Sequence, residues 1–170
     1  AIEVVLVGDT FDDAYDQALE DCKANNSTFV HPFDDEKVIE GQATVGLEIT
    51  QEADFPIDYL FLPVGGGGLS AGVSSVLHLL SPETKIIGVE PAGAPAMHEA
   101  FKQNHVVELD RIDKFVDGAA VKKVGTRTFP ICKENLQEIR LVEEGKICST
   151  LISMYNENGI VLEPAGCLSV

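Results

Sequence analysis

The sequence predicts an α/β fold, an open parallel twisted sheet with helices on both faces. Short apolar runs of strand length alternate with segments whose apolar residues recur at helical spacing. Such alternation is typical of parallel strands joined by helical crossovers. The chain has 170 residues and is 45% hydrophobic, which is enough to bury a core of ordinary size.

The first third of the chain contains two expected strands and two expected helices. The β-branched run Ile2–Val7 predicts a strand, and apolar positions at helical spacing predict a helix over 11–22. The residues between them, Gly8-Asp9-Thr10, are candidates for the helix cap. A short strand is expected at Thr28–Val30, and a helix over Val38–Glu52 follows the break at Pro32.

The middle of the chain carries the strongest strand signal, at Ile57–Val64. Four glycines follow it, and the small and apolar residues Leu69–Leu80 then predict a helix. A second buried strand is expected at Lys85–Val89, with a helix over Ala94–Gln103 after it. This is the order of elements in a parallel sheet.

The last third begins with a looser stretch, 105–127, in which Asp117-Gly118 is a turn signal. Beyond it the pattern predicts, in order, a helix at 129–135, a strand at 138–142, a helix over 142–158 ending at Asn158-Gly159, a strand at 160–162 and a helix beginning at Ala165.

The composition argues against several classes of partner. The formal charge is −16, and the first 58 residues hold 15 of the 28 acidic but only 2 of the 12 basic side chains. Such a surface repels a phosphodiester backbone, so we expect no nucleic-acid partner, and we read the acid excess as an aid to solubility.

No apolar run approaches the ~20 residues that span a bilayer, so no membrane association is expected. Four cysteines without CxxC spacing read as free thiols, which favours the cytoplasm.

The glycine run Gly65–Gly68 lies between the strongest strand and a helix. Glycines in a row let several backbone N–H groups turn toward one anion, because no Cβ obstructs the approach or forbids a positive φ. The start of a helix adds unpaired N–H groups and a partial positive charge. A strand, this loop and a helix together predict a phosphate-binding cradle at the carboxyl end of the strand. A flexible linker is the alternative, but linkers are not framed by apolar elements.

The glycines alone do not say which phosphate is bound. Gly66-x-Gly68-x-x-Ala71 fits the dinucleotide fingerprint, and Glu90 ends the next strand, where a ribose-binding acid would lie. A nicotinamide-dependent oxidoreductase is therefore one candidate. Two observations argue against it. A match to this fingerprint is nearly forced within a run of four glycines, and 56 residues precede Ile57, although such a fold would normally begin with this strand.

Five sequence blocks carry a more specific resemblance. PVGGGGLSAG (63–72) followed by IIGVEP (86–91) is similar to the phosphate loop and next strand of the fold type II pyridoxal-phosphate enzymes. HPFDDEKVIEGQATVGLEI (31–49), DGAAVKKVG (117–125) and NGIVLEPAG (158–166) resemble threonine dehydratases in order and rough spacing. The chain therefore resembles part of a member of the threonine dehydratase family, whose cofactor is pyridoxal 5'-phosphate.

The resemblance implies roles for seven residues. The amides of Gly65, Gly66, Gly67, Gly68 and Leu69 would bind the cofactor phosphate. The backbone at Gly118 would lie beside the cofactor, and Glu163 near the pyridine ring. An ordinary turn glycine and a first-turn helix acid remain alternative readings of these last two.

The resemblance also implies that the catalytic residues lie elsewhere. The Schiff-base lysine and an Asn-containing loop are expected before residue 1, and a hydroxyl or thiol for the ring nitrogen after Val170, so Cys167 and Ser169 are not taken for it. None of the lysines present, such as Lys37, Lys122 or Lys123, lies in the family's lysine motif. No catalytic residue is therefore predicted in this chain.

We expect no metal site. Glu90 resembles the first ligand of a cation site in serine racemase-like members, with the Ala94 carbonyl as a second ligand. The pattern then fails, because Ala96 stands where an acid would be needed, and a structural role for Glu90 is expected. The four histidines show no paired ligand spacing.

The function that the resemblance implies is deamination of threonine, or of serine, to a 2-oxo acid and ammonia. Threonine would give 2-oxobutanoate, toward isoleucine or in catabolism. Residues 1–32 would be the end of the family's small domain, and 33–170 the central part of the large one, truncated at both ends. The intact protein is expected to be a cytoplasmic homo-oligomer with an amino-acid substrate. A non-catalytic anion-binding module stays an alternative.

Overall fold

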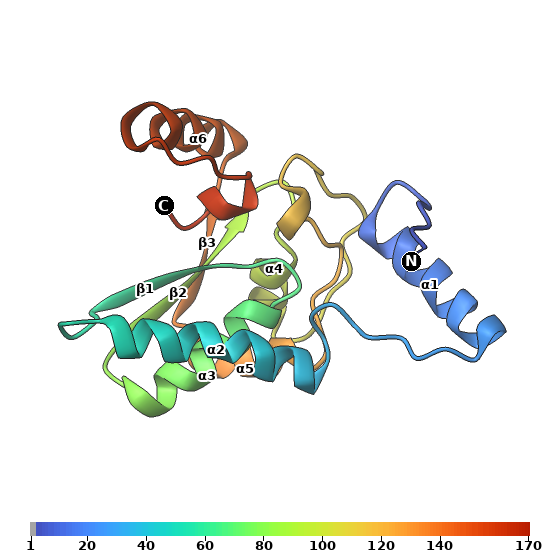
Figure 1. Cartoon of the computed structure of the whole chain (residues 1–170), viewed down its shortest axis with the longest axis horizontal. Helices are drawn as coiled ribbons and strands as arrows, with labels where there is room; N and C mark the ends of the chain where they lie inside the picture. Colours follow the sequence, from blue (N-terminus) through green and yellow to red (C-terminus); the bar gives the residue numbers. More distant parts are fainter. Residues whose placement is uncertain (1–2) are drawn as a thin grey trace.

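The computed structural model describes residues 3–170 and has a three-stranded parallel sheet at its centre (Figure 1). The strands are β1 (Tyr59–Pro63), β2 (Lys85–Pro91) and β3 (Glu138–Val142), paired in that order. In the register, Leu62 lies beside Gly88, and Gly88 beside Ile139. All three strands therefore end at the same edge of the sheet, and the predicted open parallel α/β sheet is confirmed.

One face of the sheet is covered by four helices. These are α2 (Glu36–Glu52), α3 (Gly68–Leu80), α4 (Ala96–Gln103) and α5 (Thr128–Asn135). Leu62, Ile86 and Ile139 of this face pack with buried residues such as Leu77 of α3 and Met97 of α4, both fully buried. Burial of apolar surface stabilises this packing by ~25 cal/mol per Å².

The opposite face is covered by α6 (Glu144–Asn158) and the short 3₁₀ turn η2 (Ala165–Cys167), and a second turn, η1 (Asp117–Ala119), packs beside them. Val89 of β2 belongs to this second cluster together with Ile147 of α6. Figure 1 shows α6 and η2 on the side of the strands away from α2 and α3. Helical elements thus lie on both faces, as predicted.

The remaining helix, α1 (Phe11–Asn25), stands apart from the sheet and is joined to α2 by an extended segment (Figure 1). It begins at Thr10, whose hydroxyl accepts from the Asp13 amide while the Asp13 carboxylate accepts from the Thr10 amide. This capping box confirms one of the expected cap residues. No residue of α1 is buried; its Phe11 ring lies against Phe33, and its Tyr15 ring against Phe29 and His31.

Three predicted strands are wrong. Residues 3–7 of the first expected strand, Ile2–Val7, form no strand, and Ile2 lies outside the described residues. The expected strands Thr28–Val30 and Ile160–Leu162 are also absent. Leu6 is 92% exposed. Apolar and β-branched composition favours an extended backbone, but a strand needs a hydrogen-bonded neighbour, and within residues 3–170 none lies beside these segments.

Some predicted helix boundaries also shift. The helix expected from Ala94 begins at Ala96, after Pro95, and the helix expected from Val142 begins at Glu144, because Val142 pairs with Pro91 in the sheet. The helix expected from Ala165 is the single turn η2. Gly159 does end α6, with a φ of +67° that suits glycine. No helix in the described part of the chain is both long and apolar enough to cross a membrane.

The close packing of α2 against α3 generates a first prediction. A Cβ at Gly72 of α3 would lie 2.5 Å from the Ile39 carbonyl oxygen and 2.6 Å from the Ala43 nitrogen, both backbone atoms of α2. We expect Gly72→Ala to lower the free energy of unfolding by about 1–3 kcal/mol, because the helices must separate. Urea unfolding followed by circular dichroism measures this.

Gly41→Ala is the matched control. Gly41 is exposed on α2, and a Cβ there meets no atom within 4 Å. This variant should raise the free energy of unfolding by about 0.5–1 kcal/mol, because alanine loses less backbone entropy in a helix. Equal effects at both positions would contradict the close helix contact.

Candidate functional site

The glycine loop joins the end of β1 to the start of α3. The Val64 amide donates to the Val89 carbonyl at 2.8 Å, which ties the last residue before the loop to β2. The chain then turns at Gly67, whose φ of +93° is rarely adopted by residues that have a Cβ. The buried Ser70 hydroxyl donates to the Pro63 carbonyl at 3.0 Å and holds the start of α3 against the end of β1.

The amides of this loop are the main polar feature of the site. Among residues 3–170, none of the N–H groups of Gly65–Leu69 donates a hydrogen bond to another group of the chain. The first N–H groups of a helix have no partner within it, and the helix dipole makes this end partly positive. A phosphate group satisfies both conditions, because it offers several acceptor oxygens and negative charge.

The loop is so tightly enclosed that a side chain at three of its glycines would collide with neighbouring residues. A Cβ at Gly65 would lie 2.9 Å from Ala119 Cα, one at Gly66 would collide with the Phe33 ring, and one at Gly68 would lie 2.9 Å from Phe33 Cβ. The glycines are thus required by packing as well as by access to an anion. The sequence reasoning missed Phe33, although it lies in the block 31–49 that carried the resemblance.

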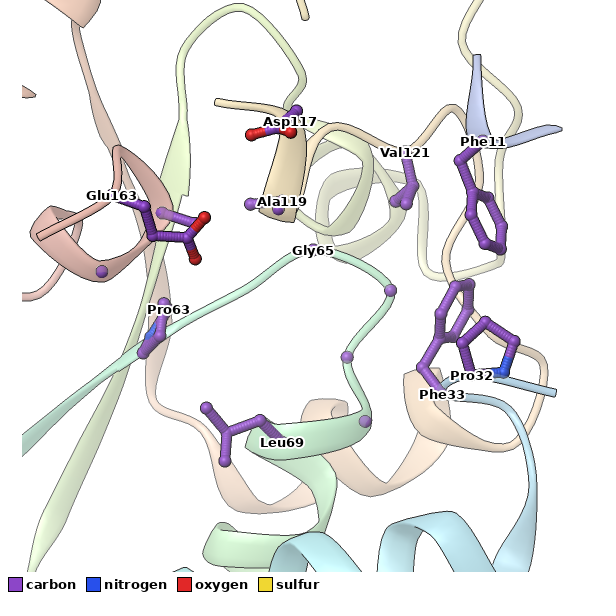
Figure 2. A pocket seen from close by; sticks show the side chains of 16 residues that line it. Phe11, Pro32, Phe33, Pro63, Gly65, Leu69, Asp117, Ala119, Val121 and Glu163 are labelled. Carbon is purple, nitrogen blue, oxygen red and sulfur yellow. The ribbon is translucent and has the colours of Figure 1, made fainter. Parts of the chain in front are cut away.

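The loop forms one wall of a cleft of about 430 Å³ at the carboxyl edge of the sheet (Figure 2). All seven residues predicted to contact the cofactor line this cleft: Gly65, Gly66, Gly67, Gly68, Leu69, Gly118 and Glu163. The described residues that line it include no lysine and no histidine. The structure therefore brings the predicted site residues together, while their contact with a cofactor stays a prediction.

The wall of the cleft that faces the loop is built from η1 and η2. A Cβ at Gly118 would lie 2.9 Å from Ala165 Cβ and 3.2 Å from the Glu163 Oε1 atom, so this glycine permits the two turns to touch. Figure 2 shows the Glu163 carboxylate directed toward the glycine loop. Asp117 and Ala119 complete this wall, and Pro32, Phe33 and Val121 make part of the lining apolar.

Glu90 lies at the end of β2 but outside this cleft. Its side chain is fully buried, and its two carboxylate oxygens accept from the Met97 amide at 2.8 Å and the His98 amide at 2.9 Å. Burial raises the pKa of Glu90 to about 8, although the two amides lower it. Glu90 therefore holds the start of α4, the structural role expected for it. No cluster of three or more potential metal ligands occurs within residues 3–170.

Comparison with known proteins decides the family. Residues 1–170 match the family described as "Pyridoxal-phosphate dependent enzyme". The chain belongs to this pyridoxal-phosphate enzyme family.

Similar proteins share most of this chain but are longer. It is 56% identical to the "L-threonine dehydratase biosynthetic IlvA" of Halalkalibacterium halodurans and 53% identical to that of Bacillus subtilis, over 99% of this chain in each case. The chain spans only 41% and 40% of the length of these relatives. The processed form of threonine deaminase isoform 2 from Solanum lycopersicum superposes with a TM-score of 0.91 and 42% identity, over 98% of this chain and 48% of that one.

The buried carboxyl of Glu90 generates a second prediction. Its pKa in the folded chain, about 8, lies above its ordinary value of 4.5, so the folded state binds more protons than the unfolded state between these two values. The carboxyl's contribution to stability should therefore be fully present below pH 4.5 and be lost as the pH rises toward 8. Urea midpoints of the native chain, compared with those of Glu90→Gln from pH 5 to 8, measure this.

The native chain should lose stability relative to Glu90→Gln across that pH range. Glutamine keeps the size of the side chain but cannot titrate, so all other titrating groups cancel in the difference. A difference that does not change with pH would show that Glu90 does not resist ionisation in the folded chain.

Proposed function

We propose that this chain supplies the phosphate cradle and one wall of the active site of a pyridoxal-phosphate-dependent threonine ammonia-lyase, which converts threonine to 2-oxobutanoate and ammonia. The observation that carries the proposal is the set of unpaired amides of Gly65–Leu69 at the mouth of a cleft. The relatives named as biosynthetic threonine dehydratases support the choice of reaction.

The residues of the cleft fit the cofactor in their chemistry. The Gly65–Leu69 amides would bind the phosphate, and the α3 dipole adds to the attraction. The η1 backbone at Gly118 would lie beside the cofactor, and Glu163 would lie near the ring. When bound, pyridoxal phosphate supplies an electron sink for the negative charge that develops at the amino-acid Cα.

The chain holds only part of the proposed site. No lysine lines the cleft within the described residues, so the covalent attachment point of the cofactor would come from outside 1–170. We propose the same for the residues that select threonine over serine. The small-domain assignment of 1–32 fits α1, which has no buried residue, while 33–170 would belong to the large domain. A cytoplasmic homo-oligomer is proposed for the intact enzyme.

The nicotinamide alternative loses its main support in the structure. Its ribose-binding acid would be Glu90, but both oxygens of that carboxylate are bound by amides of α4, and the side chain is inaccessible. A non-catalytic anion-binding module would use the same amides. Activity of the intact enzyme, with its lysine, separates that alternative from the lyase.

The proposed position of the lysine outside residues 1–170 generates a third prediction. The purified 170-residue chain, supplied with threonine and pyridoxal phosphate, should form no 2-oxobutanoate above the rate of the free cofactor. Lactate-dehydrogenase-coupled oxidation of NADH measures the product, and the free cofactor with serum albumin serves as the control. Threonine-dependent turnover by the chain itself would refute the assignment of the lysine to another segment.

The cradle generates a fourth prediction. Pyridoxamine 5'-phosphate, which lacks the aldehyde that reacts with any lysine, should raise the melting temperature of the chain by roughly 5–10 °C at 100 times its Kd. Pyridoxamine without the phosphate, and NAD, should raise it much less at equal concentration. Differential scanning calorimetry measures these shifts. A larger shift with NAD would favour the dinucleotide-binding alternative instead.

A further inference from the structure

Thr128, the first residue of α5, touches the glycine loop from behind. Its side chain is fully buried, and its hydroxyl donates to the Gly66 carbonyl oxygen at 2.6 Å. The Gly125 amide donates to the same oxygen at 3.2 Å. Thr128 is not among the residues that line the cleft, so it has no direct access to a ligand there.

The bond to Gly66 fixes the direction of the next amide. No cis peptide bond occurs among the described residues, and in a planar trans peptide the C=O and the N–H point in opposite directions. Holding the Gly66 carbonyl toward α5 therefore turns the Gly67 N–H away from α5. The next carbonyl is held as well, because Gly67 O accepts from the Ala71 amide at 2.8 Å and lies 3.8 Å from the Cys132 thiol.

Asp34 holds Thr128 in place from a segment far away in the sequence. Its carboxylate accepts from the backbone amides of Thr126, Arg127 and Thr128 and from the Thr126 hydroxyl, at 2.7–3.2 Å. It caps α5, a helix with no cap from its own neighbouring side chains. Burial would raise the pKa of Asp34, but these hydrogen bonds outweigh it and lower the pKa below the usual value.

We propose that Thr128 and Asp34 are positioning residues for the phosphate cradle. Asp34 fixes the start of α5, Thr128 there fixes the Gly66 carbonyl, and the Gly67 amide is thereby kept directed at the anion. This proposal rests on the proposed function, because it concerns the same loop. It adds two side chains that touch neither cofactor nor substrate and act only through the direction of the loop backbone.

The test compares Thr128→Val with Thr128→Ser in the 170-residue chain. Valine keeps the shape and removes the hydroxyl, whereas serine keeps the hydroxyl. Pyridoxamine 5'-phosphate is titrated into ¹⁵N-labelled chain, and the amide resonances of Gly65–Gly68 report binding. Loss of one hydrogen bond should weaken binding roughly three- to tenfold, because the Gly125 amide still holds the Gly66 carbonyl. Thr128→Ser should bind within about twofold of the native chain.

Thr44→Val is the matched control. The Thr44 hydroxyl also donates to a backbone carbonyl, that of Gly41, but on the exposed side of α2. This variant should bind as the native chain does. Asp34→Asn, which keeps one acceptor oxygen, should weaken binding as Thr128→Val does. If Thr128→Val does not fold, as loss of its dispersed amide resonances would show, the Asp34→Asn result decides the test.

The possible outcomes separate the two proposals. If the native chain binds through the glycine amides and Thr128→Val binds equally well, the positioning role is wrong and the cradle stands. If the native chain shows no change at these amides, the cradle itself is wrong. Weaker binding in Thr128→Val, with recovery in Thr128→Ser, supports the positioning role, since a general loss of packing would not be repaired by the smaller serine.

Discussion

The first amides at the N-terminus of α3 have no hydrogen-bond acceptor within the helix, and no other group in the described chain accepts from them either. Five consecutive N–H groups, those of Gly65–Leu69, donate no hydrogen bond to any group within residues 3–170. Leaving buried polar groups without partners is unfavourable, so such a loop persists only where a ligand or solvent reaches it. The cleft beside it provides that access.

This requirement explains why segments far apart in the sequence converge on one short loop. Phe33 precedes α2, Ala119 belongs to η1 and Thr128 begins α5, yet each lies against a different part of the loop. Thr128 lies on the side of the loop away from the cleft, whereas Phe33 and Ala119 pack against the loop and also line the cleft. The Gly66 and Gly67 carbonyls have hydrogen-bond partners, while within residues 3–170 the amides of Gly65–Leu69 have none.

Sequence reasoning found the features that are encoded locally. Strand, glycine run and helix follow one another in the chain, so their order predicts the cradle directly, and the Thr10 cap and the Gly159 helix end are equally local. The wrong strands, such as 3–7 and 160–162, failed because pairing depends on a neighbouring strand that composition does not reveal. The contacts of Thr128 and Asp34 were missed for a related reason, since they join residues 62 and 92 or more positions apart.

The proposed cradle is made of main chain, and this has a consequence for how such a protein can diversify. Backbone amides recognise the charge and shape of a phosphate and are indifferent to whatever else the ligand carries. Changes in substrate preference would therefore have to arise in side chains on other walls of the cleft, while the loop tolerates almost no replacement because Phe33 and Ala119 leave no space for one. An engineer who wishes to redirect the chemistry should leave residues 65–69 untouched and randomise around them.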